Sequence, residues 1–557
     1  MMEYSAFEPQ FVTYQNNTQQ KLYVQTDKSF YSAGEKIWFT GFLVESIGHI
    51  PVILDQYINV DLYSPDGLIV TNQIIRRDST GFNGSITLPA DLQEGHYILR
   101  AYSRWMVESA PDFLFHKTIR IGNKILTDIQ TEIAYEKQPD ANRRMKIRFV
   151  RNNKEPMSKK KIRCELFSDN NPDKIFTLRT DKEGRIEFDL PTDTDKRIKR
   201  VVQCTIEDAA IEFSRRFVIP PTDFDFDVSF HPEGGDRLNG VHQTVAFKAI
   251  SNRGTSLPIK GVVVNQKGDT ICLLNTEHDG MGSCLLYGDS IETLHALVCG
   301  NGIQKQFPLP AVKRLGAAIC VKKLKNDLVL DLKITNEDSD SLTLLGHTRG
   351  DLWFSKKLPA KNTTLSIPTD EMTGGILHLL LLKGEKPISE RLFFIPPPDP
   401  PHVEMNSLHG SFNPRTELNL ALKMDQYHAL DGWYAMSVTD ATLVEPDTIN
   451  ANIRSHLFLT SDLKGYVENP NYYLNENTLQ TQRHTDLLMM THGWRRFSVE
   501  SWEDKETIKQ YIPEISQQIT GRVENRTGKG IETDLITIFP YNNSFIMVKL
   551  IKPDILE

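Results

Sequence analysis

The sequence predicts a mainly β protein of tandem immunoglobulin-like or fibronectin-like β-sandwich domains, with a few short helices near residues 448–511. Three observations predict this fold class. The chain has 557 residues, which is too many for a single hydrophobic core. A polar turn followed by strand-like alternation recurs roughly every 100 residues. Apolar strands also run into prolines at two places, as expected at joints between domains.

The recurring turn occurs three times. Each copy begins with an aspartate, and we predict that Gly81, Gly184 and Gly282 take the positive φ angle that the turn requires. The residues after each glycine alternate between apolar and polar, as in a strand with one buried face. Three copies at this spacing predict three successive sandwiches.

The two proline-rich joints lie at residues 216–221 and 391–397, and Asp399-Pro400-Pro401 extends the second. Proline has no N–H to donate to a sheet, so it ends the strand and stiffens the link. We therefore expect an N-terminal segment and six domains, at 1–18, 19–124, 125–221, 222–311, 312–399, 400–512 and 513–557. The domain at 400–512 is expected to be a sandwich with a helical insertion, and the last domain to be incomplete.

The last third of the chain carries the helical signal. Residues 452–459 and 486–494 have apolar side chains at helical spacing. Ser501 is followed by acidic residues in the next turn, which is typical of a helix start. The most apolar run, residues 376–382, is about as long as one buried strand and far shorter than a membrane-spanning helix.

Charge and cysteine content narrow the function. The net charge is -8, and no basic stripe is present to bind phosphates, so a nucleic-acid partner is not expected. The six cysteines form no Cys-x-x-Cys or His-Cys ligand spacing. Buried free thiols are favoured, and a Cys272–Cys284 bridge is the alternative. The first residues lack signal-peptide features, which taken alone indicates a cytoplasmic protein; the alternative is that a leader has been removed.

A family resemblance begins at residues 22–39. An alternating strand, a turn over Tyr31 to Gly34 and a second strand with Ile37 and Phe39 facing the core resemble the opening of the second macroglobulin domain of the alpha-2-macroglobulin superfamily. Residues 57–67 and 92–100 resemble its central and closing strands. The resemblance implies a string of macroglobulin β-sandwiches.

Further segments resemble envelope proteins of Bacteroidetes that carry such domains. These are residues 228–236, 245–249, 461–470 and 491–497. Residues 519–531 resemble the first hairpin of a carboxypeptidase-regulatory-like β-sandwich, and in similar proteins a TonB-plug-like domain follows. One feature departs from the thioester-forming macroglobulins: no cysteine here is followed by Gly-Glu-Gln, and Cys299-Gly300 continues as Asn301.

One partner-binding site is a candidate. His492, Trp494, Arg495 and Arg496 could bind an acidic or aromatic ligand, because guanidinium groups stack on rings and pair with carboxylates. An amphipathic helix end, with the tryptophan packed inward and the arginines capping carbonyls or pairing at a domain joint, explains the same pattern better.

Two further clusters are interpreted as turns. Residues 231–236 hold a histidine and two carboxylates without the periodicity of a metal site, so we expect Glu233 and Asp236 to bond local amides. His278-Asp279 resembles a base with its orienting carboxylate, but the sequence offers no nucleophile. We expect no catalytic residue, no cofactor and no metal.

The sequence thus favours a non-enzymatic interaction or structural module of the bacterial cell envelope, in the periplasm or at the outer-membrane surface. Its expected partners are envelope proteins or peptide or glycan ligands, with membrane association only through parts outside this chain. Two alternatives stay open: endopeptidase inhibition, and an accessory role in TonB-dependent outer-membrane uptake.

Overall fold

The computed structural model describes residues 19–492 apart from short gaps, and three short pieces beyond them. The gaps are 109–110, 124–128, 138–142, 170, 192–199, 209–210, 221–223, 336–340, 401–402, 406–412, 414, 425–432, 443, 445–446 and 448–449; the later pieces are 513–514, 535–538 and 546–549. The predictions for 1–18, for Trp494, Arg495 and Arg496, for the helix after Ser501 and for the hairpin at 519–531 lie outside the described residues.

The first sandwich packs a three-stranded sheet, β1-β3-β6, against a five-stranded sheet, β2-β8-β7-β4-β5. Its strands are β1 (Gln20–Thr26), β2 (Phe30–Ser32), β3 (Lys36–Glu45), β4 (Tyr57–Tyr63), β5 (Ile69–Arg76), β6 (Phe82–Thr87), β7 (Gly95–Tyr102) and β8 (Phe115–Gly122), with the 3-10 helices η1 (Arg104–Glu108) and η2 (Pro111–Phe113) before β8. Ile37 and Phe39 are buried in the core while Trp38 between them is exposed, so the predicted alternation of β3 is confirmed.

The second and third sandwiches each pair a three-stranded with a four-stranded sheet. The second has the sheets β13-β10-β9 and β12-β11-β14-β15, formed by β9 (Ile129–Lys137), β10 (Arg143–Arg151), β11 (Lys161–Ser168), β12 (Asn171–Arg179), β13 (Arg185–Leu190), β14 (Arg200–Asp208) and β15 (Ile211–Val218). The third has β16-β18-β21 and β20-β19-β22-β23, formed by β16 (Phe226–Pro232), β18 (His242–Ser251), β19 (Ile259–Val264), β20 (Thr270–Asn275), β21 (Met281–Tyr287), β22 (His295–Gly300) and β23 (Ile303–Pro308); the short strands β17 (Arg237–Leu238) and β24 (Val312–Lys313) pair in parallel beside it.

The fourth sandwich repeats this plan with β25-β26-β29 against β28-β27-β30-β31. Its strands are β25 (Ala317–Leu324), β26 (Asp327–Ile334), β27 (Ser341–Thr348), β28 (Asp351–Pro359), β29 (Thr363–Pro368), β30 (Gly375–Lys383) and β31 (Lys386–Ile395). The apolar run at 376–382 forms a single strand buried on both faces, as predicted. β31 ends directly before Pro396, so the proline joint lies where the sequence places it.

The turn glycines bear out the repeat and correct its register. Gly184 and Gly280 have φ angles of +78° and +71°, whereas Gly282, the predicted turn glycine, lies inside β21. A Cβ on Gly184 would lie 2.4 Å from a carbonyl oxygen and 3.0 Å from a backbone nitrogen, and one on Gly280 would lie at 2.4 and 3.1 Å from the same kinds of atom. The third copy of the turn therefore uses Gly280, because the aspartate before it already begins the left-handed turn.

The helical signal is confirmed between residues 451 and 492. The helices are α2 (Ile453–Phe458), η4 (Thr460–Asp462), α3 (Tyr472–Asn475) and α4 (Leu479–Thr491). Elsewhere in the predicted domain at 400–512, the described residues form a hairpin of β32 (Val403–Met405) and β33 (Leu422–Met424); β34 (Leu535–Ile538) pairs with β35 (Ile546–Lys549) further on. Among the residues described, no helix is both long and apolar enough to span a membrane.

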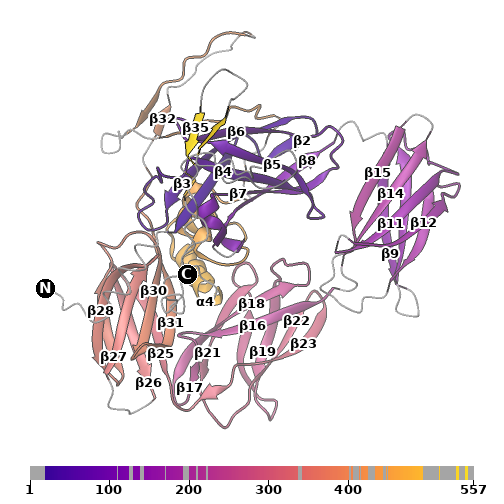
Figure 1. Ribbon diagram of the computed structural model, residues 1–557. Coiled ribbons are helices and arrows are strands. Elements are labelled where there is room, and N and C mark those ends of the chain that lie inside the picture. Colours follow the sequence, from indigo (N-terminus) through magenta and orange to yellow (C-terminus); the bar gives the residue numbers. More distant parts are fainter. Residues whose placement is uncertain are drawn as a thin grey trace.

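Figure 1 shows how these parts are arranged. The second sandwich stands apart from the rest, and α4 lies between the first sandwich and the pair formed by the third and fourth. We call residues 451–492 the helical segment, and its contacts with these three sandwiches the hub.

Candidate functional site

The helical segment is built by local caps. The side chain of Asn452 accepts a hydrogen bond from the backbone N–H of Ser455 at 2.9 Å and so begins α2. Thr478 begins α4 in the same way, through the N–H of Thr481 at 3.1 Å. Asn471, between the two helices, accepts from the hydroxyl of Ser455 at 2.6 Å. These bonds fix short helices that would be marginal alone.

Apolar burial holds the helical segment to the third and fourth sandwiches. One core cluster joins all three parts: Leu459, Leu463, Val467, Tyr473, Leu487, Leu488 and Met489 from the helical segment, Ala246 and Met281 from the third sandwich, and Ile376, Leu392 and Phe394 from the fourth. Fully burying one such side chain stabilises by about 1.5–3 kcal/mol, so this shared core binds the three parts firmly.

A buried ion pair joins the helical segment to the first sandwich. Lys21 of β1 is completely buried, and its Nζ lies 2.5 Å from a carboxylate oxygen of Asp462 in η4, which is 3% exposed. The same ammonium donates to the carbonyl oxygen of Leu457 at 2.7 Å. A buried ammonium needs both a counter-charge and hydrogen-bond acceptors, and the helical segment supplies the carboxylate of Asp462 and the carbonyl oxygen of Leu457.

Arg349 of the fourth sandwich also lies close to Asp462. It lies in the turn between β27 and β28, and its guanidinium donates to the carbonyl oxygens of Ile47 at 3.2 Å and Gly374 at 2.9 Å. Asp462 lies 3.9 Å away. Burial lowers the pKa of Arg349, while the neighbouring Asp462 opposes that shift. The carboxylate of Asp462 therefore faces cations from two different sandwiches.

His49 of the first sandwich closes this corner of the hub. Its ring meets the ring of Phe458 edge to face at 4.9 Å. Burial, reinforced by the charges of Lys21 and Arg349, lowers the pKa of His49 to about 2, so the ring is neutral near neutral pH.

A second buried network ties the third and fourth sandwiches to α4. Arg391 of β31 donates to Glu233 at 3.1 Å and to Asp486 of α4 at 2.7 Å. Burial disfavours the guanidinium charge, but Asp486 and Glu233 outweigh this effect and raise the pKa of Arg391. Glu233 also accepts from the backbone N–H of Val321 at 3.0 Å, on the open edge of β25.

This network corrects the prediction for residues 231–236. The tight turn is present, with positive φ angles at Gly234 and Gly235. The carboxylates, however, do not bond local amides as expected: Glu233 bonds the neighbouring sandwich, and Asp236 pairs with Lys313 at 2.7 Å. The sequence alone could not reveal these partners, which lie roughly 75 to 160 residues further along the chain.

His278 and Asp279 also lie in the hub. Their side chains are 3.2 Å apart, and the ring of His278 stacks on His484 of α4 with centroids at 4.3 Å. The hydroxyl of Tyr472 lies 2.7 Å from the Nδ1 of His484. Burial lowers the pKa of both histidines, and the ring of His278 also stacks on that of Tyr472 with centroids at 4.5 Å, so both rings are neutral packing groups near neutral pH. Beside them, Arg483 pairs with Glu277 of the third sandwich at 3.0 Å.

Of the predicted partner-binding residues, His492 is the one that the structure describes. Its backbone N–H ends α4 by donating to the carbonyl of Leu488 at 2.9 Å. Burial lowers the pKa of its ring to about 4. The preceding Thr491 contacts the sulfur of Met281 at 3.1 Å, which places this helix end against the third sandwich.

A cavity of about 1080 Å³ opens beside the hub. Its walls come from β25, from the prolines after β31 and from α3 and α4. Arg454 holds the proline wall in place by donating to the carbonyl oxygens of Pro397 at 3.2 Å and Pro398 at 2.6 Å. Lys322, Lys323, Glu476 and Asp486 give the cavity charges of both signs.

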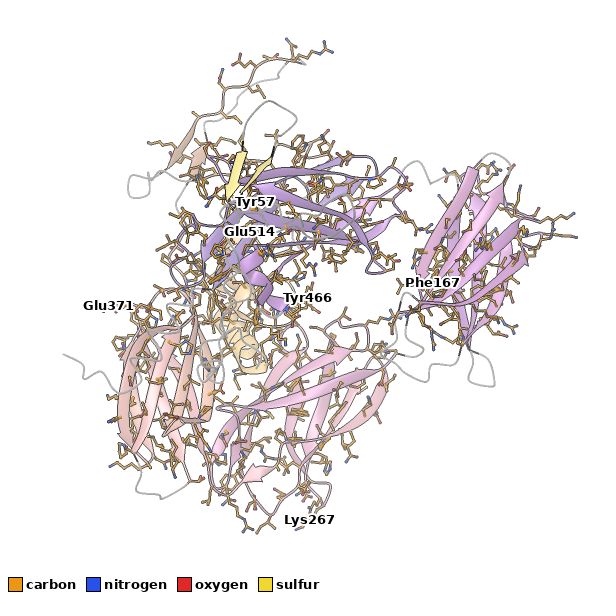
Figure 2. The ribbon with its side chains drawn as sticks, viewed as in Figure 1. Tyr57, Phe167, Lys267, Glu371, Tyr466 and Glu514 are labelled. Carbon is orange, nitrogen blue, oxygen red and sulfur yellow. The ribbon has the colours of Figure 1, made fainter. Side chains whose placement is uncertain are left out.

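The second sandwich contacts the first through polar groups. Arg216 pairs with Asp66 at 2.6 Å, and Arg215 pairs with Glu94. Gln93 donates to the carbonyl of Ser214 at 3.1 Å. In Figure 2, Phe167 marks the side of the second sandwich that faces the rest of the molecule, and Arg216 stacks over its ring at 4.6 Å. Such a contact resembles a mobile inter-domain interface more than a fixed one.

A comparison with known protein families found a match to the first sandwich. The fold defines the chain as a string of β-sandwich domains with a helical segment packed among three of them. Residues 21–113, which form most of the first sandwich, match the family described as the MG2 domain. A search of curated proteins found no match.

Three solved structures illustrate distant similarities to this chain. Trypsin-activated alpha-2-macroglobulin from Escherichia coli is 12% identical, with a TM-score of 0.29, over 74% of this chain and 33% of that one. Salmonella alpha-2-macroglobulin reacted with methylamine is 13% identical, with a TM-score of 0.28, over 74% and 32%. A tetra-tandem repeat of a large adhesion protein is 12% identical, with a TM-score of 0.16, over 68% and 99%. This chain thus spans about a third of the length of the macroglobulins.

Proposed function

We propose that this chain is a non-enzymatic, multi-domain interaction and structural module of the bacterial cell envelope. The observation that carries the proposal is the hub: its ionised groups pair with one another across domain boundaries. Lys21 with Asp462, and Arg391 with Glu233 and Asp486, join sandwiches to the helical segment. Charges used in this way stabilise one arrangement of domains, which suits a scaffold that presents loops and edge strands to partners.

The envelope context is part of the same proposal. The MG2 domain supports a macroglobulin-type protein, and we infer an origin in Bacteroidetes, a carboxypeptidase-regulatory-like domain from residue 513 and a TonB-plug-like domain beyond residue 557 from the sequence resemblance. The proposed partners are envelope proteins or peptide or glycan ligands. An accessory role in TonB-dependent uptake is one form that this function takes.

In-cell photo-crosslinking tests the proposal. A photoreactive residue replaces Lys182, in an exposed turn of the second sandwich, or Lys357, on an exposed strand of the fourth. We expect discrete crosslinked envelope proteins, and we expect no turnover of peptide, ester or glycan substrates by the purified chain. Fractionation to the cytoplasm, crosslinks only to cytosolic proteins, or substrate turnover that is lost with a single hub variant would contradict the proposal.

Protease inhibition is the second candidate, because an MG2 domain is present. No cysteine of this chain precedes Gly-Glu-Gln, so inhibition here would have to proceed without that thioester. Incubation with several proteases distinguishes the candidates. Physical trapping blocks cleavage of large substrates and spares small ones. An unchanged rate on both, with the chain nicked only at loops, favours the scaffold.

A further inference from the structure

Two cysteines face each other in the second sandwich. Cys164 of β11 and Cys204 of β14 are direct partners in the antiparallel register, and their sulfur atoms lie 3.8 Å apart. Directly opposed residues in an antiparallel pair have Cα atoms about 4.5 or 5.5 Å apart, and both values lie within the range that bridged cysteines adopt. The register therefore places the two cysteines at a backbone separation that suits a disulfide.

The surroundings favour a permanent bridge over a reactive one. Both side chains are fully buried in the core of the sandwich, among Ile162, Leu166 and Phe213. The thiol of Cys164 and burial both raise the pKa of Cys204, which disfavours the thiolate in the folded domain. Thiol–disulfide exchange needs a thiolate and access for the oxidant, so the folded sandwich slows both formation and reduction of the bond.

We propose that Cys164 and Cys204 are a disulfide site, oxidised as β11 and β14 pair during folding in the presence of a small disulfide oxidant such as oxidised glutathione. One cysteine thiolate attacks a sulfur of the oxidant, which forms a mixed disulfide and releases one glutathione thiol. The second cysteine attacks the protein sulfur of that mixed disulfide and releases the other. The two cysteines together lose two protons and two electrons, which the oxidant carries away as two thiols.

The bond has a structural use in this part of the molecule. The second sandwich contributes no residue to the core cluster that the helical segment shares with the third and fourth sandwiches, and its contact with the first sandwich is polar. A bridge between residues that are 40 positions apart closes a loop that contains β12 and β13, and restricts the unfolded chain. The proposal does not depend on the envelope function, because the oxidant can be supplied to the purified chain.

The test refolds the full chain from urea in reduced and oxidised glutathione, traps free thiols by alkylation and maps peptides by mass spectrometry. We expect a peptide pair joined through Cys164 and Cys204, lighter by two hydrogen atoms than the reduced pair. Cys164→Ser removes this species, whereas Cys272→Ser, a matched change in the third sandwich, leaves it. The reduced chain, once folded, forms the bridge at least about tenfold more slowly in the same buffer.

Several outcomes would overturn the inference. The refolded wild-type chain would contradict it if both cysteines were alkylated, or if Cys164 were joined mainly to a cysteine other than Cys204. An equal rate of bridging in the folded and refolding chains would overturn the proposed timing. A further readout is the urea midpoint of the bridged chain, which a reductant lowers by more in the wild type than in the Cys164→Ser/Cys204→Ser variant. The peptide map of the wild-type chain shows by itself whether the bridge forms, so the test still works if a variant fails to fold.

Discussion

Replacing Asp462 with asparagine removes the negative charge at the centre of the hub and leaves two cations in place. Lys21 is fully buried and 2.5 Å from this carboxylate, and Arg349, 2% exposed, is 3.9 Å from it. Asparagine keeps the size of the side chain and can still accept a hydrogen bond, so the change is mainly one of charge.

The magnitude follows from the burial of both partners. Removing one partner of a buried ion pair costs about 3–5 kcal/mol, because the other charge stays out of water without compensation. We expect Asp462→Asn to lower the free energy of unfolding by that amount. A Lys21→Met/Asp462→Leu double variant should recover part of the loss, because it removes the closer pair of charges together and leaves Arg349 as the one cation that has lost the carboxylate.

Urea unfolding measures the total effect, and hydrogen exchange in β1 and α2 shows where the loss occurs. Asp331→Asn is the matched control, since Asp331 pairs with Lys333 at 2.6 Å on the surface of the fourth sandwich, where both side chains are about one-third exposed. A surface pair contributes about 0–1 kcal/mol. If Asp462→Asn costs no more than Asp331→Asn, the reasoning about the hub is wrong.

Three further perturbations have expected outcomes. Burial lowers the pKa of His49 to about 2 and of His492 to about 4, so the unfolded chain binds protons below pH 6.5 while the folded rings stay neutral. The contribution of these two rings to the free energy of unfolding should be complete above pH 6.5 and should fall by up to about 1.4 kcal/mol per pH unit for each ring down to pH 4. Urea midpoints at pH 7.5 and pH 5 measure this loss, and His49→Gln should reduce it. A midpoint that changes between the two pH values no more than the carboxylates account for, and that changes equally in His49→Gln, would contradict the prediction. Gly280→Ala should lower the free energy of unfolding by more than about 1 kcal/mol, because the new Cβ would lie 2.4 Å from a carbonyl oxygen. Gly254→Ala is the control, since Gly254 has a similar positive φ angle but open space around its Cβ position. Equal losses of free energy in urea unfolding would count against the effect of the close approach. Arg216→Ala should loosen the second sandwich further, since Arg215 and Gln93 keep their contacts, and should raise the radius of gyration in X-ray scattering. An unchanged value would mean that this ion pair does not restrict the joint.

The fold was largely predictable because the pattern of apolar and polar residues along a strand indicates which of its faces are buried. Alternation at Ile37 and Phe39, the apolar run at 376–382 and the prolines after β31 are local signals, and each has the predicted structure. The turn register was wrong only where Asp279-Gly280-Met281-Gly282 offers two glycines. Periodicity alone cannot choose between them, whereas the close approach of a carbonyl oxygen to Gly280 does.

The hub was not predictable, because its partners are far apart in sequence. Lys21 and Asp462 are charged residues that composition assigns to the surface, and their burial depends on how separate domains pack. One local signal was present: Leu22, Tyr23 and Val24 are consecutive apolar residues in β1 and are all buried, which indicates a strand covered on both faces. The second cover is the helical segment, and no pattern within β1 could identify it.

The helical segment locks the first, third and fourth sandwiches into one body, while the second sandwich is held loosely. Pulsed electron–electron double resonance between paired spin labels measures this arrangement. The labels are attached to unnatural amino acids, because the chain has six cysteines of its own. Labels at Arg76 and Lys357, exposed on the first and fourth sandwiches, should give one narrow distance distribution. Labels at Arg76 and Lys182 should give a broad one. A distribution for the first pair as broad as that for the second would contradict the claim.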